Sequence, residues 1–207
     1  MHDALIADLT GSKGSIRSLI NQELPLLRDH LLRLDTESRR DRFNGFADEG
    51  FIDRYAKKCG GDGTIIVAFF AEDGSVHAAA ELHQPDLHID SLPEIAFSVE
   101  SHLRRKGIGS ILFKQLMEVA RSLGYEELRI TTGSQNQAMR ALANKFGAHL
   151  TFRQGESTGT IDLQQYPDTV VAAPTIDIPG GAANALIAFN QACWNLFLRM
   201  SGLNRAA

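Results

Sequence analysis

Cysteine is scarce in this chain. Only two cysteines occur among 207 residues, Cys59 and Cys193, and they form no C-x-x-C pair. Two isolated cysteines argue against a disulfide framework and against a structural zinc site built from thiolates. We therefore expect the protein to work in a reducing compartment, the cytoplasm.

Long apolar runs and an excess of positive charge are also missing. No apolar run approaches the roughly 20 residues that a membrane span needs, and the first fifteen residues are too polar for a signal peptide. The formal net charge of -4 and the pI near 6.0 argue against a dedicated nucleic-acid-binding protein. The sequence therefore predicts a soluble protein whose partners include neither a nucleic acid nor a membrane.

Apolar and polar residues alternate in a pattern that predicts one α/β or α+β core with appendages. A hydrophobic content of 43% is enough to bury such a core. The Asp73-Gly74 turn between two apolar runs predicts a hairpin, and Asp35 or Thr36 is expected to begin a helix. The expected order is β, α, α, β, β, β, α, β, α, β, β, with strands at 14–20, 94–99 and 127–133 and helices at 49–58, 108–124 and 136–147 among them.

A basic, glycine-containing stretch precedes one of these helices. Residues 104–109 read RRKGIG. The stretch lacks the Lys-Ser/Thr pair of an ATP-binding P-loop, and Leu112 stands where a dinucleotide fingerprint has its third glycine. A helix start with bare backbone amides still binds anions, and Arg104, Arg105 and Lys106 would add charge. The alternative is an ordinary strand-to-helix turn with a solvated basic face.

The neighbours of this stretch carry a family resemblance. Strand 94–99, then R-x-x-G-x-G, an amphipathic helix, a strand and the segment NQAMRALANKFGA from Asn136 resemble the GNAT superfamily of acyl-CoA-dependent N-acetyltransferases. The resemblance extends from about residue 14 to residue 163. It implies an α+β, three-layer fold with a mixed, mostly antiparallel sheet flanked by helices. It also implies acetyl-CoA as the cosubstrate, with no metal.

The same resemblance implies which residues bind the coenzyme. In the family the glycine signature cradles the CoA pyrophosphate, and the preceding strand offers backbone groups to the pantetheine arm. The position of Asn136 commonly contacts CoA, although Asn136 is also a plausible helix cap. The cofactor-binding residues implied are Phe97, Ser98, Val99, Arg104, Arg105, Lys106, Gly107, Ile108, Gly109, Ser110 and Asn136.

Acetyl transfer to an amine requires a base that removes a proton from the acceptor ammonium. Glu94 begins the strand before the glycine loop, where members of the family often carry a glutamate base, and it is our first candidate. Glu81 is the second, and the alternative for both is a solvent-facing residue at a strand end. Many members have a tyrosine, which acts as the general acid, where this chain has Ala143. The leaving thiolate would therefore be protonated by a water or a nearby hydroxyl, or it would leave without an acid.

The segment HLLRLDTESRRDRF resembles the first helical region of bacterial GNAT domains of the protein lysine acetyltransferase type. This resemblance implies an amine acceptor, either a small molecule or a protein lysine, with Arg39, Arg42 and Phe43 in the wall of its site. The function implied is N-acetyl transfer by direct attack in a ternary complex. The alternative is a non-catalytic acyl-CoA-binding sensor or scaffold. The spacing of His83, His88 and Asp90 could suggest a metal site, but we interpret these three as surface residues.

The C-terminal part lies outside the resemblance. We expect a domain over residues 1–163, an extended linker with three prolines over 164–180, and an apolar helix with its tail over 181–207. The helix has too wide an apolar stripe to remain exposed. It is expected either to fold back on its own domain or to pair in a two-fold homodimer, and we favour the homodimer.

Overall fold

The computed structural model describes residues 13–85, 92–153 and 155–165. Contacts divide the chain into two units, Met1–Asp168 and Thr169–Ala207, and the fold below is that of the first. The predicted C-terminal helix and nearly all of the predicted linker lie outside the described residues. Within these residues, no helix has both the length and the apolarity that crossing a membrane requires.

Seven strands form one sheet in the order β1-β2-β3-β4-β5-β7-β6. All neighbouring pairs are antiparallel except β4 and β5, which run parallel. The predicted mixed, mostly antiparallel sheet is thus confirmed. The strands are β1 (Gly14–Ser18), β2 (Ile65–Ala71), β3 (Val76–His83), β4 (Glu94–Val99), β5 (Glu127–Gly133), β6 (Thr151–Arg153) and β7 (Glu156–Asp162).

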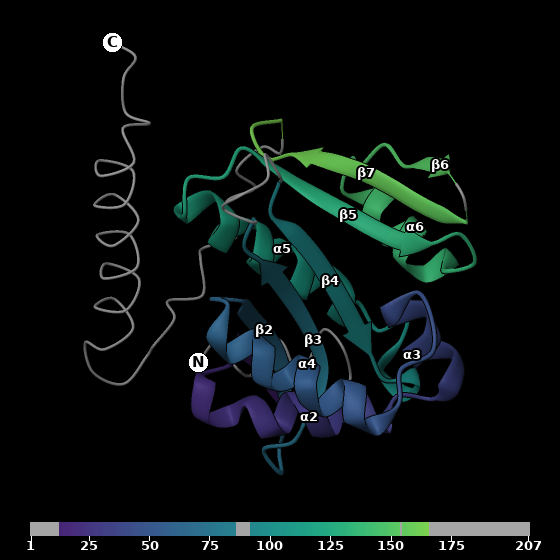
Figure 1. Ribbon diagram of the computed structural model, residues 1–207. Coiled ribbons are helices and arrows are strands. Elements are labelled where there is room, and N and C mark those ends of the chain that lie inside the picture. The colour runs from purple at the N-terminus through teal and green to yellow at the C-terminus, as the bar shows by residue number, and fades with distance from the viewer. Residues whose placement is uncertain (1–12, 86–91, 154, 166–207) are drawn as a thin grey trace. The chain divides into compact units, whose positions relative to one another are not determined.

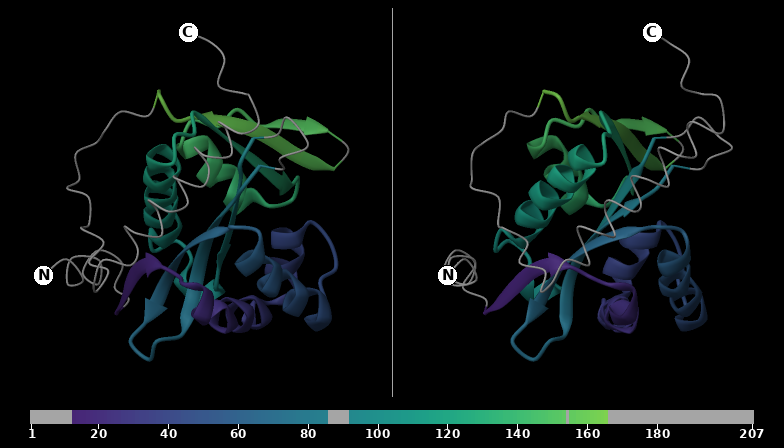
Figure 2. Two further views of the ribbon diagram at one scale, coloured as in Figure 1. Left: turned by 60° about the vertical axis from the view of Figure 1, so that its left-hand side comes forward. Right: turned by 90° about the vertical axis from the view of Figure 1, so that its left-hand side faces the viewer.

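Helices cover both faces of the sheet (Figures 1 and 2). On one face, Leu27 and Leu31 of α2 pack with Ile52 of α4 over β2 and β3. On the other, Phe113 and Leu116 of α5 fill a larger core together with α6. The helical segments are η1 (Asn21–Glu23), α2 (Leu24–Arg33), α3 (Thr36–Phe43), α4 (Glu49–Gly61), η2 (Ser101–Leu103), α5 (Ile108–Ser122) and α6 (Gln137–Lys145).

Local signals set most helix ends, as the sequence predicts. The Asp35 side chain accepts a hydrogen bond from the backbone N–H of Ser38 and caps α3. Helix α4 differs from the prediction, because it continues past residue 58 to Gly61. A Cβ atom on Gly60 would lie 2.5 Å from a methyl carbon of Leu24 in α2, so a larger residue there would require the Leu24 side chain to move.

The two parallel strands separate soon after they meet. Only Glu94 with Arg129 and Ile95 with Ile130 are paired between β4 and β5. On its other side β4 remains paired with β3 as far as Val99. Among the described residues, no strand pairs with the β5-facing edge of β4 beyond Ile95. The sheet therefore splits in its centre and leaves backbone groups of β4 available.

Candidate active site

A cavity of about 350 Å³ lies at this split. Helices α3 and α4, the end of β3, the separating strands β4 and β5 and the start of α6 all contribute to its wall. The cavity has polar, charged and aromatic side chains together, as a site for a polar ligand requires. The polar, charged and aromatic residues in its wall include Asp41, Arg42, Phe43, Tyr55, His83, Glu94 and Asn136.

Glu94 lies in the wall of the cavity, where β4 begins. One of its oxygens, Oε2, is 3.0 Å from Nη2 of Arg129 on the neighbouring strand, and its side chain is 33% exposed. The carboxylate is therefore held in place by Arg129 and still reachable from the cavity. These are the geometric requirements for a general base.

Glu81 is completely buried, so the alternative in which it faces solvent is wrong. Arg42 Nη2 lies 2.9 Å from Glu81 Oε1, and the two groups form an ion pair whose geometry is not that of a hydrogen bond. The Tyr55 hydroxyl donates a hydrogen bond to the other oxygen, Oε2. Burial alone would raise the pKa of Glu81. The Arg42 charge outweighs burial with help from His83 and Tyr55, and the pKa falls to about 2.

Tyr55 and His83 belong to the same network and reach the cavity. The Tyr55 hydroxyl accepts a hydrogen bond from Arg42 and lies 3.1 Å from His83 Nε2. Burial raises the pKa of Tyr55 well above its usual value, and the Glu81 charge adds to this despite Arg42. His83, which we interpret as a surface residue, has a side chain that is 26% exposed and also contacts this network. His88 and Asp90 lie outside the described residues.

The residues expected in the acceptor wall divide into two groups. Arg42 and Phe43 line the cavity, and the Phe43 ring packs edge-on against Tyr55 with centroids 5.1 Å apart. Arg39 points elsewhere and donates to the backbone carbonyls of Leu32 and Leu34.

Asp41 is a cavity residue that sequence reasoning missed. Burial raises the pKa of its carboxyl group, and the nearby Glu37 adds to the shift. Among the described residues, no hydrogen bond or ion pair engages the Asp41 carboxylate. An exposed-looking aspartate in a charged helix carries no sequence signal of such a position, which depends on how α3 packs against β4 and β5.

The glycine loop has an unusual backbone. Arg105 and Gly107 have φ values of 60° and 84°, and Gly107 is the N-cap of α5 without a side-chain cap. The first amides of a helix have no partner within it, so the start of α5 presents N–H groups and a positive dipole end. Lys145 of α6 adds charge here, since its Nζ lies 3.0 Å from the Ser110 hydroxyl.

Two predicted cofactor residues have additional contacts. The Arg104 side chain reaches α3, where it donates to the Ser38 hydroxyl, and it also donates to the Val99 carbonyl at 3.2 Å. Asn136 caps α6 by accepting from the Met139 N–H at 2.9 Å, and it lines the cavity.

The position that usually holds a tyrosine cannot supply an acid. Ala143 has no side-chain hydroxyl and no exposed surface, because it packs in the core between α6 and the sheet. The Tyr55 hydroxyl reaches the cavity, but its proton is directed at Glu81.

Comparison with known proteins gives a consistent result. A model of the acetyltransferase (GNAT) family matches residues 31–148. The fold is similar to the GNAT domain of PAT from S. lividans, with a TM-score of 0.62 and 18% identity over 73% of this chain and 92% of that one.

Two similar structures contain the coenzyme. A phosphinothricin acetyltransferase from Sinorhizobium meliloti in complex with AcCoA matches with a TM-score of 0.54 and 18% identity over 78% of this chain and 97% of that one. The PaiA N-acetyltransferase from Thermoplasma acidophilum in complex with coenzyme A matches with a TM-score of 0.53 and 17% identity, over 72% and 98% respectively. At these identities the likeness shows the fold.

Proposed function

This chain belongs to the acetyltransferase (GNAT) family and is an acyltransferase, and from that premise we propose that it moves the acetyl group of acetyl-CoA to a primary amine. The observation that carries the proposal is the split between β4 and β5. There, a cavity with two carboxylates lies beside the edge of β4 that, beyond Ile95, no β5 residue pairs with. The similar structures in complex with acetyl-CoA and coenzyme A support the choice of cosubstrate.

The coenzyme is bound in two ways. Its diphosphate lies at the start of α5, where the amides after Gly107 and the charge of Lys145 favour an anion. Its pantetheine arm extends along β4, whose backbone offers hydrogen bonds in the manner of an added strand. The Val99 carbonyl already accepts from Arg104, so the arm relies chiefly on the backbone of Phe97 and Ser98.

The acetyl group moves in one displacement. Glu94 takes a proton from the acceptor ammonium, the neutral nitrogen attacks the thioester carbonyl, and the C–S bond breaks as the amide forms. Glu81 is a poor base for this step, because its pKa of about 2 leaves little affinity for a proton. The thiolate leaves without a protein acid, since a thiol with a pKa of about 8.5 is already a tolerable leaving group.

Asp41 and the aromatic wall recognise the acceptor. Among the described residues, no hydrogen bond or ion pair engages the Asp41 carboxyl group, and a carboxylate in such a partly buried wall attracts a cation. The acceptor enters as an ammonium ion. Phe43 and Tyr55 give the same wall an apolar surface against which the carbon chain of an amine can pack. Both a small amine and a lysine side chain satisfy these requirements.

The test is release of CoA with polyamines, amino acids, aminoglycosides and lysine peptides as acceptors. With an active acceptor, Glu94→Gln should lower kcat by roughly 10²-fold and leave acetyl-CoA affinity unchanged. The matched control is Glu127→Gln, an exposed glutamate at the start of β5, which should behave like the wild type. Asp41→Asn should raise KM for the amine and leave KM for acetyl-CoA unchanged.

Two results would contradict the proposal. Full activity in Glu94→Gln would remove that residue as the base. Tight acetyl-CoA binding without turnover of any acceptor would instead support a non-catalytic acyl-CoA sensor.

A further inference from the structure

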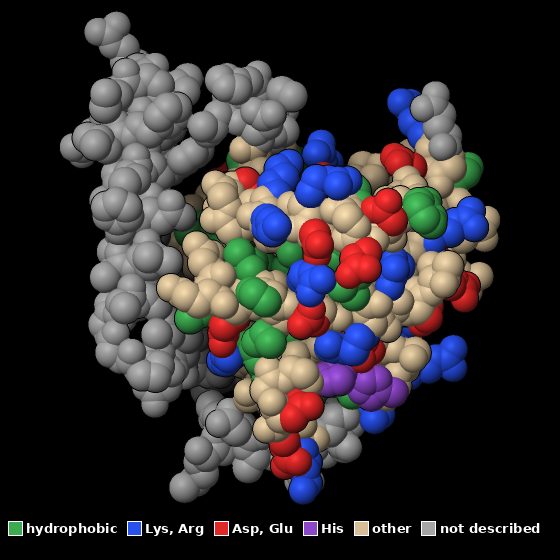
Figure 3. Space-filling model, turned by 60° about the horizontal axis from the view of Figure 1, so that its bottom comes forward, with side chains coloured by type: hydrophobic (Ala, Val, Ile, Leu, Met, Phe, Trp, Pro, Cys, Tyr) green, Lys and Arg blue, Asp and Glu red, His purple; other side chains and the backbone are tan. Residues whose placement is uncertain are grey.

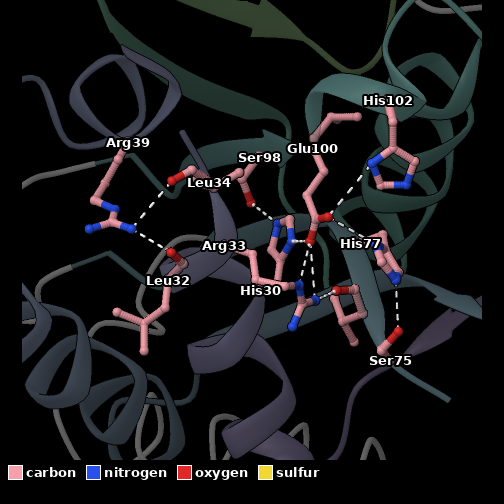
Figure 4. A network of polar contacts seen from close by, with 12 residues as sticks. His30, Leu32, Arg33, Leu34, Arg39, Ser75, His77, Ser98, Glu100 and His102 are labelled. Atoms are coloured by element: carbon pink, nitrogen blue, oxygen red, sulfur yellow. Dashed lines mark hydrogen bonds and ion pairs between the residues drawn. The ribbon is translucent and has the colours of Figure 1, made fainter. Parts of the chain in front are cut away.

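A second polar cluster lies around Glu100, directly after β4, and none of its residues lines the cavity. Four side chains converge on this one carboxylate: His30, Arg33, His77 and His102 (Figure 4). Histidine side chains also gather beside Lys and Arg side chains on one face of the molecule (Figure 3). Glu100 itself is buried.

One oxygen of Glu100 is fully occupied by protein donors. Oε1 accepts from Arg33 Nε at 3.1 Å and lies 3.0 Å from His30 Nδ1. Because a carboxylate oxygen can only accept, His30 Nδ1 carries a proton and donates it to Oε1, while Nε2 lies 2.8 Å from the Ser98 hydroxyl.

The tautomer of His77 follows from a chain of hydrogen bonds. The Ser75 hydroxyl donates its only proton to the Asp73 carboxylate. Ser75 Oγ can therefore only accept from His77 Nε2, which lies 2.7 Å away. His77 Nε2 thus carries a proton. When His77 is neutral, its lone pair is on Nδ1.

This lone pair faces the other oxygen of Glu100. His77 Nδ1 lies 2.9 Å from Glu100 Oε2, and two acceptors at that distance repel unless a cation lies between them. The cation is either a proton on Nδ1 or a metal ion. His102 Nδ1 lies 3.8 Å from the same oxygen, which is too far for a hydrogen bond but suits a shared metal.

We propose that His77 Nδ1, His102 Nδ1 and Glu100 Oε2 bind one divalent transition-metal ion, with zinc as the reference ion. One ligand atom from each of the three residues lies within 4.8 Å of the other two. Ligands of tetrahedral zinc at bond lengths of about 2.0–2.2 Å lie about 3.3–3.5 Å apart, so His77 Nδ1 and Glu100 Oε2, now 2.9 Å apart, would separate slightly and His102 Nδ1, now 3.8 Å from that oxygen, would move closer. The His102 side chain is 57% exposed, which permits this movement and leaves a fourth position for water.

The surroundings support the ligands as a metal site requires. Ser75 holds the ring of His77 through the nitrogen that would not bind the metal, and His30 with Arg33 hold the oxygen of Glu100 that would not bind it. Such outer contacts orient ligands and fix their tautomers. The ion would join the start of β3 to η2, the turn directly before the glycine loop, where the Glu100 N–H already donates to the His77 carbonyl at 3.1 Å.

The experiment is a calorimetric titration of the full-length, chelator-treated protein with Zn²⁺, repeated with Co²⁺ and followed by visible absorption. We expect one ion per chain, a tetrahedral Co²⁺ spectrum and a melting temperature that rises with Zn²⁺. His77→Ala and His102→Ala should each weaken binding by at least about tenfold. His149→Ala is the matched control, because His149 is exposed and lies outside the cluster, and it should leave binding unchanged.

Three outcomes would overturn the proposal. The first is a wild-type protein that binds no Zn²⁺ and whose melting temperature does not respond to it. The second is binding that survives in His102→Ala, a variant that should fold because the side chain is largely exposed. The third is a His77 ring that nitrogen NMR shows to remain doubly protonated in the presence of Zn²⁺, since a proton would then be the cation.

Discussion

Replacing Glu81 by glutamine tests how much the buried ion pair between Glu81 and Arg42 stabilises the fold beside the cavity. The substitution keeps the shape of the side chain and an acceptor for the Tyr55 hydroxyl, but it removes the negative charge. Arg42, whose side chain is only 9% exposed, then loses its ion-pair partner. An uncompensated buried guanidinium is the main cost that we expect.

The magnitude can be obtained in two ways. Breaking a buried ion pair by removing one partner costs about 3–5 kcal/mol. The pKa of Glu81, lowered from 4.5 to about 2, corresponds to about 3 kcal/mol at about 1.4 kcal/mol per unit. Because a domain of this size loses about 2–4 °C per kcal/mol, the melting temperature of Glu81→Gln should fall by roughly 6–20 °C.

The assay is thermal unfolding of the wild type, Glu81→Gln and the control Glu127→Gln between pH 2 and pH 7. The folded-state pKa of Glu81 is lowered, so its contribution to the free energy of unfolding is complete above the unfolded pKa near 4.5 and is lost as pH falls toward about 2. The difference between wild type and Glu81→Gln should therefore be largest at pH 7 and shrink below pH 4.5.

Two results would refute this reasoning. A Glu81→Gln variant that melts like the wild type at pH 7 would mean that Arg42 does not depend on the charge of Glu81. A Glu81→Gln variant that stays folded and loses more kcat than Glu94→Gln would make Glu81 the base.

Two further predictions concern the cofactor loop and the C-terminal segment. Gly109→Val should lower the acetyl-CoA affinity measured by calorimetry at least tenfold, about 1.4 kcal/mol. The variant should keep the fold, because a Cβ atom at this position meets nothing nearer than Leu142 at 3.8 Å. An unchanged affinity would contradict the proposed anion site. The full chain should dimerise in light scattering and a chain ending at Leu163 should be monomeric, whereas a monomeric full chain at micromolar concentration would exclude the homodimer.

Much of the fold could be predicted because its signals are local. Strands β4 and β5 have the predicted bounds, since each is a run of apolar and β-branched residues between breaks in the pattern. Asp35 and Asn136 begin helices through side chains that accept from a backbone N–H three residues later. The end of α4 was predicted three residues too early, because Cys59, Gly60 and Gly61 break the helical pattern in the sequence although the helix continues through them.

Residues of the cavity wall were expected there only where one segment carries the signal. Glu94 was expected because it begins the strand before the glycine loop, and Arg42 because it lies in a recognisable helical stretch, and both line the cavity. Tyr55 and His83 come from α4 and β3, and only the packing of α4 on the sheet brings them to within 3.1 Å. Neither residue has a neighbour in sequence that indicates this contact.

The alternation along β3 explains why the unpredicted polar residues lie on one side of the sheet. Ala78, Ala80 and Leu82 belong to the apolar core beneath α5, whereas Ala79 packs in the core beneath α2 and α4. Glu81 shares the face of Ala79. The helices on that face must therefore supply Arg42 and Tyr55 to neutralise and bind a buried carboxylate. Changes in α3 and α4 should consequently alter the part of the cavity to which we assign the acceptor, while the start of α5 keeps the amides that we propose bind an anion.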